Sequence, residues 1–138
     1  MRFFLAVLAA TLVLFFLGAF EVIVLLPNYI HTHFGNFMRP PGDVRLWAIV
    51  LEKLIQSIFL VVVHRSISPA KCSFAQAAKL GALIALLLEG AWVLSMWNFY
   101  PLQFIPLLLL GVCDALRLWL AYIAAGYFYS RKPMWSNE

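Results

Sequence analysis

The stretch from Phe3 to Leu26 reads FFLAVLAATLVLFFLGAFEVIVLL, and Glu21 is its one charged residue. A strand of a membrane barrel needs only about 10 residues of alternating polarity, whereas a helix needs about 20 mostly apolar residues to cross the hydrocarbon core. The stretch therefore predicts a transmembrane helix over about 3–26, which ends before Pro27. A cleaved signal peptide fits less well, because its apolar region typically covers only about 7–15 residues.

Three further apolar stretches have a similar length and predict spans over about 46–64, 77–98 and 106–128. The chain is 64% hydrophobic and 12% charged, with a mean hydropathy of +0.92, whereas soluble domains are about 45–50% apolar and about 25% charged. In lipid the backbone must satisfy its own hydrogen bonds, as long helices do. We therefore predict an all-α polytopic membrane protein, an up-down bundle of four transmembrane helices, with residues 1–138 forming one transmembrane domain.

Four spans place the N-terminus, the second loop and the cytoplasmic tail (129–138) on one side, and the outer loop (27–45) on the other. The first side carries the basic residues Arg2, Arg65, Lys71, Lys79, Arg131 and Lys132, and the second carries Arg39 and Arg45. Because cytoplasmic flanks are enriched in Lys and Arg, we expect both termini in the cytoplasm. The formal charge of +4 follows from these flanks. The expected partners are therefore the lipid bilayer and a second copy or a larger membrane complex, with no nucleic acid.

Six ionisable residues lie within the predicted spans: Glu21, Glu52, Lys53, Glu89, Asp114 and Arg117. A charge at mid-membrane costs about 2.5–3.5 kcal/mol on insertion scales unless it is paired or hydrated, so such residues indicate a functional site by default. At a rise of about 1.5 Å per residue, the four acids lie roughly 8–14 Å from the outer ends of their spans. They therefore share the outer half of the predicted bilayer.

Helical spacing indicates which way these residues face. Small residues at every fourth position let membrane helices approach closely, and each span carries an acid on such a face. The faces are Ala6, Ala10, Gly18 and Glu21; Ala48, Glu52 and Gln56; Ala77, Gly81, Ala85 and Glu89; and Asp114, Arg117, Ala121 and Ala125. Asp114 and Arg117 form an i,i+3 pair that can partly neutralise itself. We therefore expect a polar cluster near the bundle axis that consists of Glu21, Glu52, Gln56, Glu89, Asp114 and Arg117, with Lys53 either joining it or extending to the interface.

Four roles are open for this cluster, in order of preference: hydrogen-bonded glue between helices, a ligand or ion site, a proton relay, and chemistry. The sequence has no Ser-His-Asp set, HExxH motif or glycine-rich phosphate loop, so we predict no enzyme, no catalytic residue and no cofactor. His31 and His33 have no third ligand beside them and are expected to be solvent-exposed, so no metal site is predicted. His64 is expected at the membrane boundary.

The expected function is that of a non-enzymatic integral membrane protein with an accessory, scaffold or envelope-maintenance role. The alternative is a small transporter, or a membrane protein that binds a ligand or ion through its intramembrane carboxylates.

Several short motifs resemble those of small four-span bacterial inner-membrane proteins of unknown function. They are Phe15-Phe16-Leu17-Gly18, Phe37-Met38-Arg39-Pro40, Ala78-Lys79-Leu80-Gly81-Ala82, Asn98-Phe99-Tyr100-Pro101-Leu102 and Ala124-Ala125-Gly126. The resemblance runs over most of the chain and implies four spans and an inner-membrane location, with no particular activity. Glu52, Lys53 and Arg117 match no position of that pattern.

Overall fold

The computed structural model describes residues 2–37, 43–67 and 73–129, and within these ranges the chain is all-helical. The elements are α1 (Arg2–Phe20), the π-helical segment η1 (Glu21–Leu25), α2 (Pro27–Phe34), the 3-10 turn η2 (Gly35–Phe37), α3 (Leu46–Ile67), α4 (Phe74–Phe99) and α5 (Phe104–Tyr129). Four helical stretches are long and apolar enough to cross a membrane: Arg2–Leu25, α3, α4 and α5. The predicted all-α class and the four long apolar helices are confirmed. Residues 38–42 of the predicted outer loop, residues 68–72 of the second loop and residues 130–138 of the tail lie outside the described residues.

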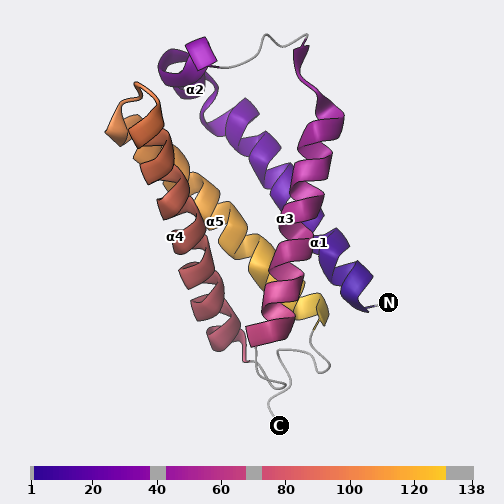
Figure 1. Ribbon diagram of the computed structural model, residues 1–138. Coiled ribbons are helices and arrows are strands. Elements are labelled where there is room, and N and C mark those ends of the chain that lie inside the picture. The colour runs from indigo at the N-terminus through magenta and orange to yellow at the C-terminus, as the bar shows by residue number, and fades with distance from the viewer. Residues whose placement is uncertain (1, 38–42, 68–72, 130–138) are drawn as a thin grey trace.

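The outer loop differs from the prediction, because it contains the helix α2. Pro27 occupies the start of α2, where its missing N–H has no helical partner to lose. The N–H of Ile30 donates to the carbonyl of Leu26 at 2.9 Å, which joins α2 to the preceding turn. Ile30 and Phe34 are buried and pack with Val93, Leu102 and Leu107. The amphipathic segment therefore lies across one end of the long helices (Figure 1).

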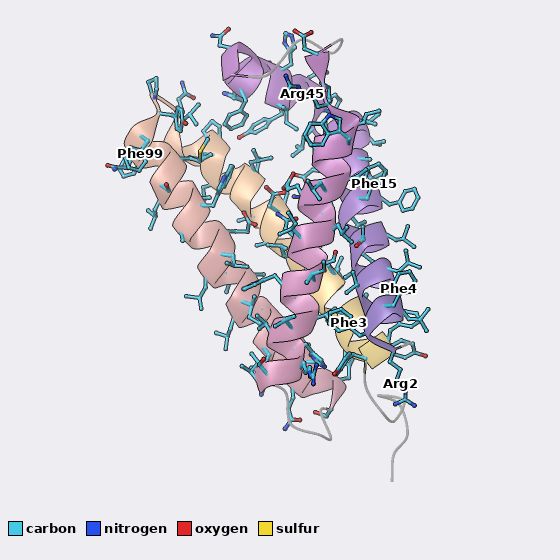
Figure 2. The ribbon with its side chains drawn as sticks, turned by 45° about the vertical axis from the view of Figure 1, so that its right-hand side comes forward. Arg2, Phe3, Phe4, Phe15, Arg45 and Phe99 are labelled. Carbon is cyan, nitrogen blue, oxygen red and sulfur yellow. The ribbon has the colours of Figure 1, made fainter. Side chains whose placement is uncertain are left out.

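Helix α5 packs extensively against α1, α3 and α4, and α1 also packs against α3. Consecutive long helices run in alternating directions, and α1 begins at the same end of the molecule at which α5 ends (Figure 1). Helices α3 and α4 have at most marginal contact with each other. They diverge toward the end that carries α2, as Figures 1 and 2 both show. The four long helices are therefore packed unevenly, and α3 and α4 leave a gap in the helix packing on one side of the bundle.

The close contacts follow the predicted small-residue faces on α1, α4 and α5. Ala6 and Ala10 of α1 and Ala121 and Ala125 of α5 are fully buried in one apolar core. On α4, Ala77, Gly81 and Ala85 are buried. A Cβ atom added at Gly81 would lie 2.8 Å from Cδ1 of Tyr122, so the glycine makes room for that ring. Trp119 Nε1 donates to the carbonyl of Ala78 at 2.8 Å and ties α5 to α4.

The buried face of α3 lies one residue further along the chain than predicted. It consists of Lys53, Ser57, Leu60, Val61 and His64, whereas Glu52 of the predicted face is exposed. Ser57 can be buried without loss because its hydroxyl donates to the Lys53 carbonyl at 2.7 Å.

His64 packs inside the bundle, which the sequence did not predict. Its ring is buried and meets the ring of Tyr122 edge-on, with the centroids 5.2 Å apart. Gly126 makes this possible, since a Cβ atom there would lie 2.9 Å from His64 Cε1. A histidine can therefore pack inside the bundle because the facing helix carries no side chain at the point of contact.

Two apolar cores divide the length of the molecule. The larger core contains Leu14, Leu60, Leu118 and Tyr122, and the smaller one contains Ile30, Phe34, Val93 and Leu107. On α5 the two cores are separated by Asp114 and Arg117, on α4 by Glu89, and before α2 by Glu21. We call the six ionisable residues Glu21, Glu52, Lys53, Glu89, Asp114 and Arg117 the polar layer.

The outside of the long helices is apolar. Phe4 and Phe99 are 69% and 75% exposed, and in Figure 2 their side chains point away from the neighbouring helices. Many leucine, isoleucine and valine side chains of all four long helices are exposed in the same way. Surfaces of this kind are typical of helices that contact lipid.

Candidate functional site

Arg117 links three parts of the chain within the polar layer. Its Nη1 donates to Glu21 Oε2 at 3.4 Å, and its Nη2 forms an ion pair with Asp114 Oδ1. The side chains of Glu21, Arg117 and Asp114 are 6%, 13% and 18% exposed. The predicted i,i+3 pair of Asp114 with Arg117 is confirmed, and Arg117 also joins the end of the first long helical stretch to α5. We call these three residues the ion triad.

Local backbone features bring the ion triad together. Glu21 begins the π-helical segment, in which the N–H of Leu26 donates to the Glu21 carbonyl at 2.9 Å. Such wide turns interrupt α-helices mostly over a single turn and frequently occur at functional sites. Gly18 lies one turn before Glu21, and a Cβ atom there would lie 2.8 Å from Arg117 Nη1. The glycine therefore leaves room for the guanidinium beside α1.

A second set of hydrogen-bonded polar side chains belongs entirely to α3. Lys53 Nζ donates to Glu52 Oε1 at 2.8 Å and to Gln56 Oε1 at 3.4 Å. Gln56 Nε2 donates to Glu52 Oε1 at 3.1 Å. The Lys53 side chain is 10% exposed and that of Glu52 is 54% exposed. Lys53 therefore packs with the other polar residues. The sequence had left open whether its side chain joins them or extends to the interface.

Glu89 is the acid of α4, and its residue is half-buried. Among the described residues it has neither a hydrogen bond nor an ion pair. The carboxylate is thus the one member of the polar layer whose charge no described cation neutralises by direct contact.

A cavity of about 540 Å³ is lined by the predicted polar residues of α3, α4 and α5. Its polar lining is Glu52, Gln56, Glu89, Asp114 and Arg117, and its apolar lining includes Ile55, Phe59, Leu88 and Trp92. A second cavity of about 370 Å³ shares Glu52, Trp92, Asp114 and Arg117 with it, and adds Glu21, Lys53 and the α2 residues Ile30 and Phe34. We call the two cavities together the polar cleft.

The cleft opens sideways between α3 and α4. Ile55, Phe59 and Leu88 line the larger cavity and are also exposed on the outside of the molecule. Toward the end at which α1 begins, the lining stops at Leu60 and Leu118, which belong to the larger apolar core. At the opposite end, Ile30 and Phe34 of α2 line the second cavity. The cleft therefore has apolar boundaries along the helix direction and an open side.

The structure places all six predicted polar residues on the walls of this cleft, but it does not bring their acids into one coordination group. Glu21 and Asp114 meet through Arg117, whereas Glu52 and Glu89 lie on the facing helices α3 and α4. Among residues 2–37, 43–67 and 73–129, no three His, Cys, Asp or Glu side chains are arranged to hold a metal ion. The arrangement can recognise charge and hydrogen-bonding groups.

Sequence reasoning left one polar contributor to the cleft open and missed one aromatic contributor. Lys53 was left undecided although it lies four residues before Ser57 and eleven before His64, a spacing that shares one helix face. Trp92 lies three residues after Glu89 and lines both cavities. The i,i+3 spacing of an acid and a tryptophan was the available signal for it.

The chain was compared with protein-family models, with curated proteins and with solved structures, and no family model, curated protein or solved structure matches it. The resemblance to small four-span bacterial membrane proteins therefore stays an expectation that comes from the sequence motifs.

Proposed function

We propose that the chain is a multi-pass integral membrane protein whose four long helices form an up-down bundle, with both termini cytoplasmic and the α2 end on the outer side of a bacterial inner membrane. The apolar exterior of the long helices supports membrane insertion. The distribution of Lys and Arg in the sequence supports the orientation. The single transmembrane domain of residues 1–138 is part of this proposal.

Within the membrane, the protein acts as a non-enzymatic accessory protein that binds a ligand or partner in the polar cleft. The observation that carries this proposal is the cavity of about 540 Å³ with the unpaired Glu89 on its wall. Ligand sites are typically concave, mostly apolar and provided with a few polar groups that fix orientation. Intramembrane acids facing a cavity are the usual mark of such a site.

The two halves of the polar layer then have different roles. The ion triad holds α1 to α5, which is the structural role expected of buried polar groups between membrane helices. Among the described residues, Glu89 and the α3 pair of Glu52 and Gln56 make no hydrogen bond or ion pair with another helix, and all three line the cleft. Binding is the role left for these three residues.

Binding is favoured over transport by the position of the apolar cores. A carrier exposes its site to each side of the membrane in turn. The core residues Leu14, Leu60, Val61 and Tyr122 are at most 1% exposed and fill the molecule between the cleft and the end at which α1 begins. A path to that side would require this core to open.

The test is to purify the protein from native membranes in a mild detergent and to identify the lipids and proteins that accompany it by mass spectrometry. Leu88→Trp narrows the mouth of the cleft, and Leu94→Trp places the same ring on an exposed position of α4 that does not line it. We expect a species that wild type and Leu94→Trp retain and Leu88→Trp loses.

One control and one contradicting outcome complete this test. Alkaline extraction of the membranes should leave the protein in the pellet, as expected for an integral protein. Equal recovery of every bound species by wild type and both variants, at unchanged stability, would contradict binding in the cleft.

A further inference from the structure

The polar layer holds more acid than base. When all six of its ionisable groups are charged, four carboxylates and two cations give a net charge of −2. Both cations already have carboxylate partners: Lys53 contacts Glu52, and Arg117 contacts Glu21 and Asp114. Glu89 is therefore the acid of the polar layer with which an additional cation can pair, because it has no ion-pair partner among the described residues.

Trp92 supplies the cleft with a second group that attracts cations. Glu89 and Trp92 lie three residues apart on α4, and both line the larger cavity. The indole ring carries negative potential on its face and binds ammonium groups within about 6 Å of its centre. A carboxylate and an indole on one wall are a combination that favours an organic cation over a bare metal ion.

The second cavity contains a buried acceptor that lacks a donor. Glu21 is 5% exposed, and its Oε1 has no hydrogen-bond partner in the described part of the chain. Buried carboxylate oxygens are almost always hydrogen-bonded, because leaving one unsatisfied is costly. Glu21 lines the second cavity, so a ligand with N–H groups could supply the missing donor directly or through water.

The open side of the cleft determines where such a ligand comes from. Exposed Ile55, Phe59 and Leu88 frame the opening between α3 and α4, on the surface that is proposed to contact lipid. A molecule entering there can leave an apolar tail among lipid chains while its head group enters the cavity. The volume of about 540 Å³ is suited to a head group of small-molecule size.

A partner helix fits this cleft less well. An α-helix with its side chains is about 10–12 Å wide and needs a groove that stays open along its axis. The cleft is bounded in that direction by Ile30 and Phe34 of α2 on one side and by Leu60 and Leu118 on the other.

We propose that the polar cleft binds the protonated amine head group of a membrane-dissolved amphiphile, with Glu89 as its counter-ion and Trp92 as its cation–π partner. This inference rests on the proposed binding function and adds the chemical class of the ligand. Glu52 and Gln56 on the facing wall of α3 contribute further acceptors for the N–H groups.

The experiment measures thermal unfolding of the full-length protein in a mild non-ionic detergent at increasing concentrations of dodecylammonium. Dodecanol has the same tail without the charge and is the matched control ligand. A ligand that binds only the folded state raises Tm in proportion to the logarithm of its concentration above Kd. We expect dodecylammonium to raise Tm and dodecanol to leave it unchanged.

Variants then assign the effect to the two residues. Glu89→Gln keeps the shape and removes the charge, and we expect it to need about tenfold more dodecylammonium for the same shift. Trp92→Leu should need about threefold more. Asp43→Asn and Trp97→Leu remove an acid and a tryptophan that do not line the cleft and should behave as wild type.

Two results would overturn the inference: an equal response to dodecylammonium and dodecanol in wild type, or an unchanged response in well-folded Glu89→Gln. The first comparison needs no variant, so it decides the matter even where a variant fails to fold. If native purification shows a species that Leu88→Trp loses, but the amine has no effect, the amine inference fails while the binding function stands. If native purification shows no such species, the binding function itself fails.

Discussion

Arg117 pairs with two carboxylates, because each of its two terminal nitrogens contacts one of them. Its Nε is buried and has no hydrogen-bond partner among the described residues. Removing one member of a buried ion pair is costly mainly because the remaining charge loses its partner, whereas replacing the whole set by neutral groups is often tolerated.

The first prediction concerns Arg117→Met. This change leaves Glu21 and Asp114 facing each other without a cation, and we expect it to lower the free energy of unfolding by about 3–5 kcal/mol. The combined variant Glu21→Gln, Asp114→Asn, Arg117→Met should recover most of that loss. The measurement is denaturant unfolding in detergent. A combined variant as unstable as Arg117→Met would contradict the interpretation that stranded charge is the cause.

Helix α4 carries two glycines in different surroundings. At Gly81 an added Cβ atom would lie 2.8 Å from Tyr122 Cδ1 and 3.1 Å from Trp119 Cδ1. At Gly90 nothing lies within 4 Å of such an atom. The two positions therefore separate the effect of side-chain bulk on helix packing from its effect on the helix itself.

The second prediction follows from this pair. Gly81→Leu should force α4 away from α5 and lower stability by about 1–3 kcal/mol or more, whereas Gly90→Leu should leave stability unchanged or raise it, because leucine favours a helix over glycine. Thermal unfolding of both variants in the same detergent checks it. Equal melting temperatures would mean that the α4–α5 contact is looser than the structure shows.

Hydropathy predicted the four long helices because each is apolar over its whole length. Small residues at every fourth position predicted the packing faces of α1, α4 and α5. The face of α3 was misassigned because Lys53 and His64 pack inward. His64 can do so because Gly126 of α5 leaves room for its ring. Helix α2 was missed because its sequence, Pro27–Phe34, is rich in turn-forming and polar residues. The cleft depends on how far α3 lies from α4, which no local pattern in the sequence encodes.

At the scale of the whole molecule, the polar layer between two apolar cores sets the depth of the cleft. Along α4 the distance from Phe99 to Glu89 corresponds to roughly 15 Å, which is about half of the hydrocarbon thickness. Along α5 the distance from Phe104 to Asp114 is the same. The proposed orientation therefore places the head-group site near the middle of the bilayer.

The third prediction tests that orientation with single cysteines at opposite ends of α4. In a chain carrying Cys72→Ser and Cys113→Ala, we introduce Ala75→Cys or Asn98→Cys, both at exposed positions. A membrane-impermeant maleimide added to intact cells should label Asn98→Cys and should label Ala75→Cys only after permeabilisation. The opposite pattern would invert the orientation, and labelling of both in intact cells would contradict a membrane-spanning α4.

Helices α3 and α4 diverge toward the α2 end. In the proposed orientation the space between these two helices is wider in the outer leaflet than in the inner one. If the chain spans the membrane as proposed, a change in the distance between α3 and α4 would change the area that the protein occupies in the outer leaflet. The equilibrium between a wider and a narrower cleft would then depend on membrane tension, to the extent that the two areas differ.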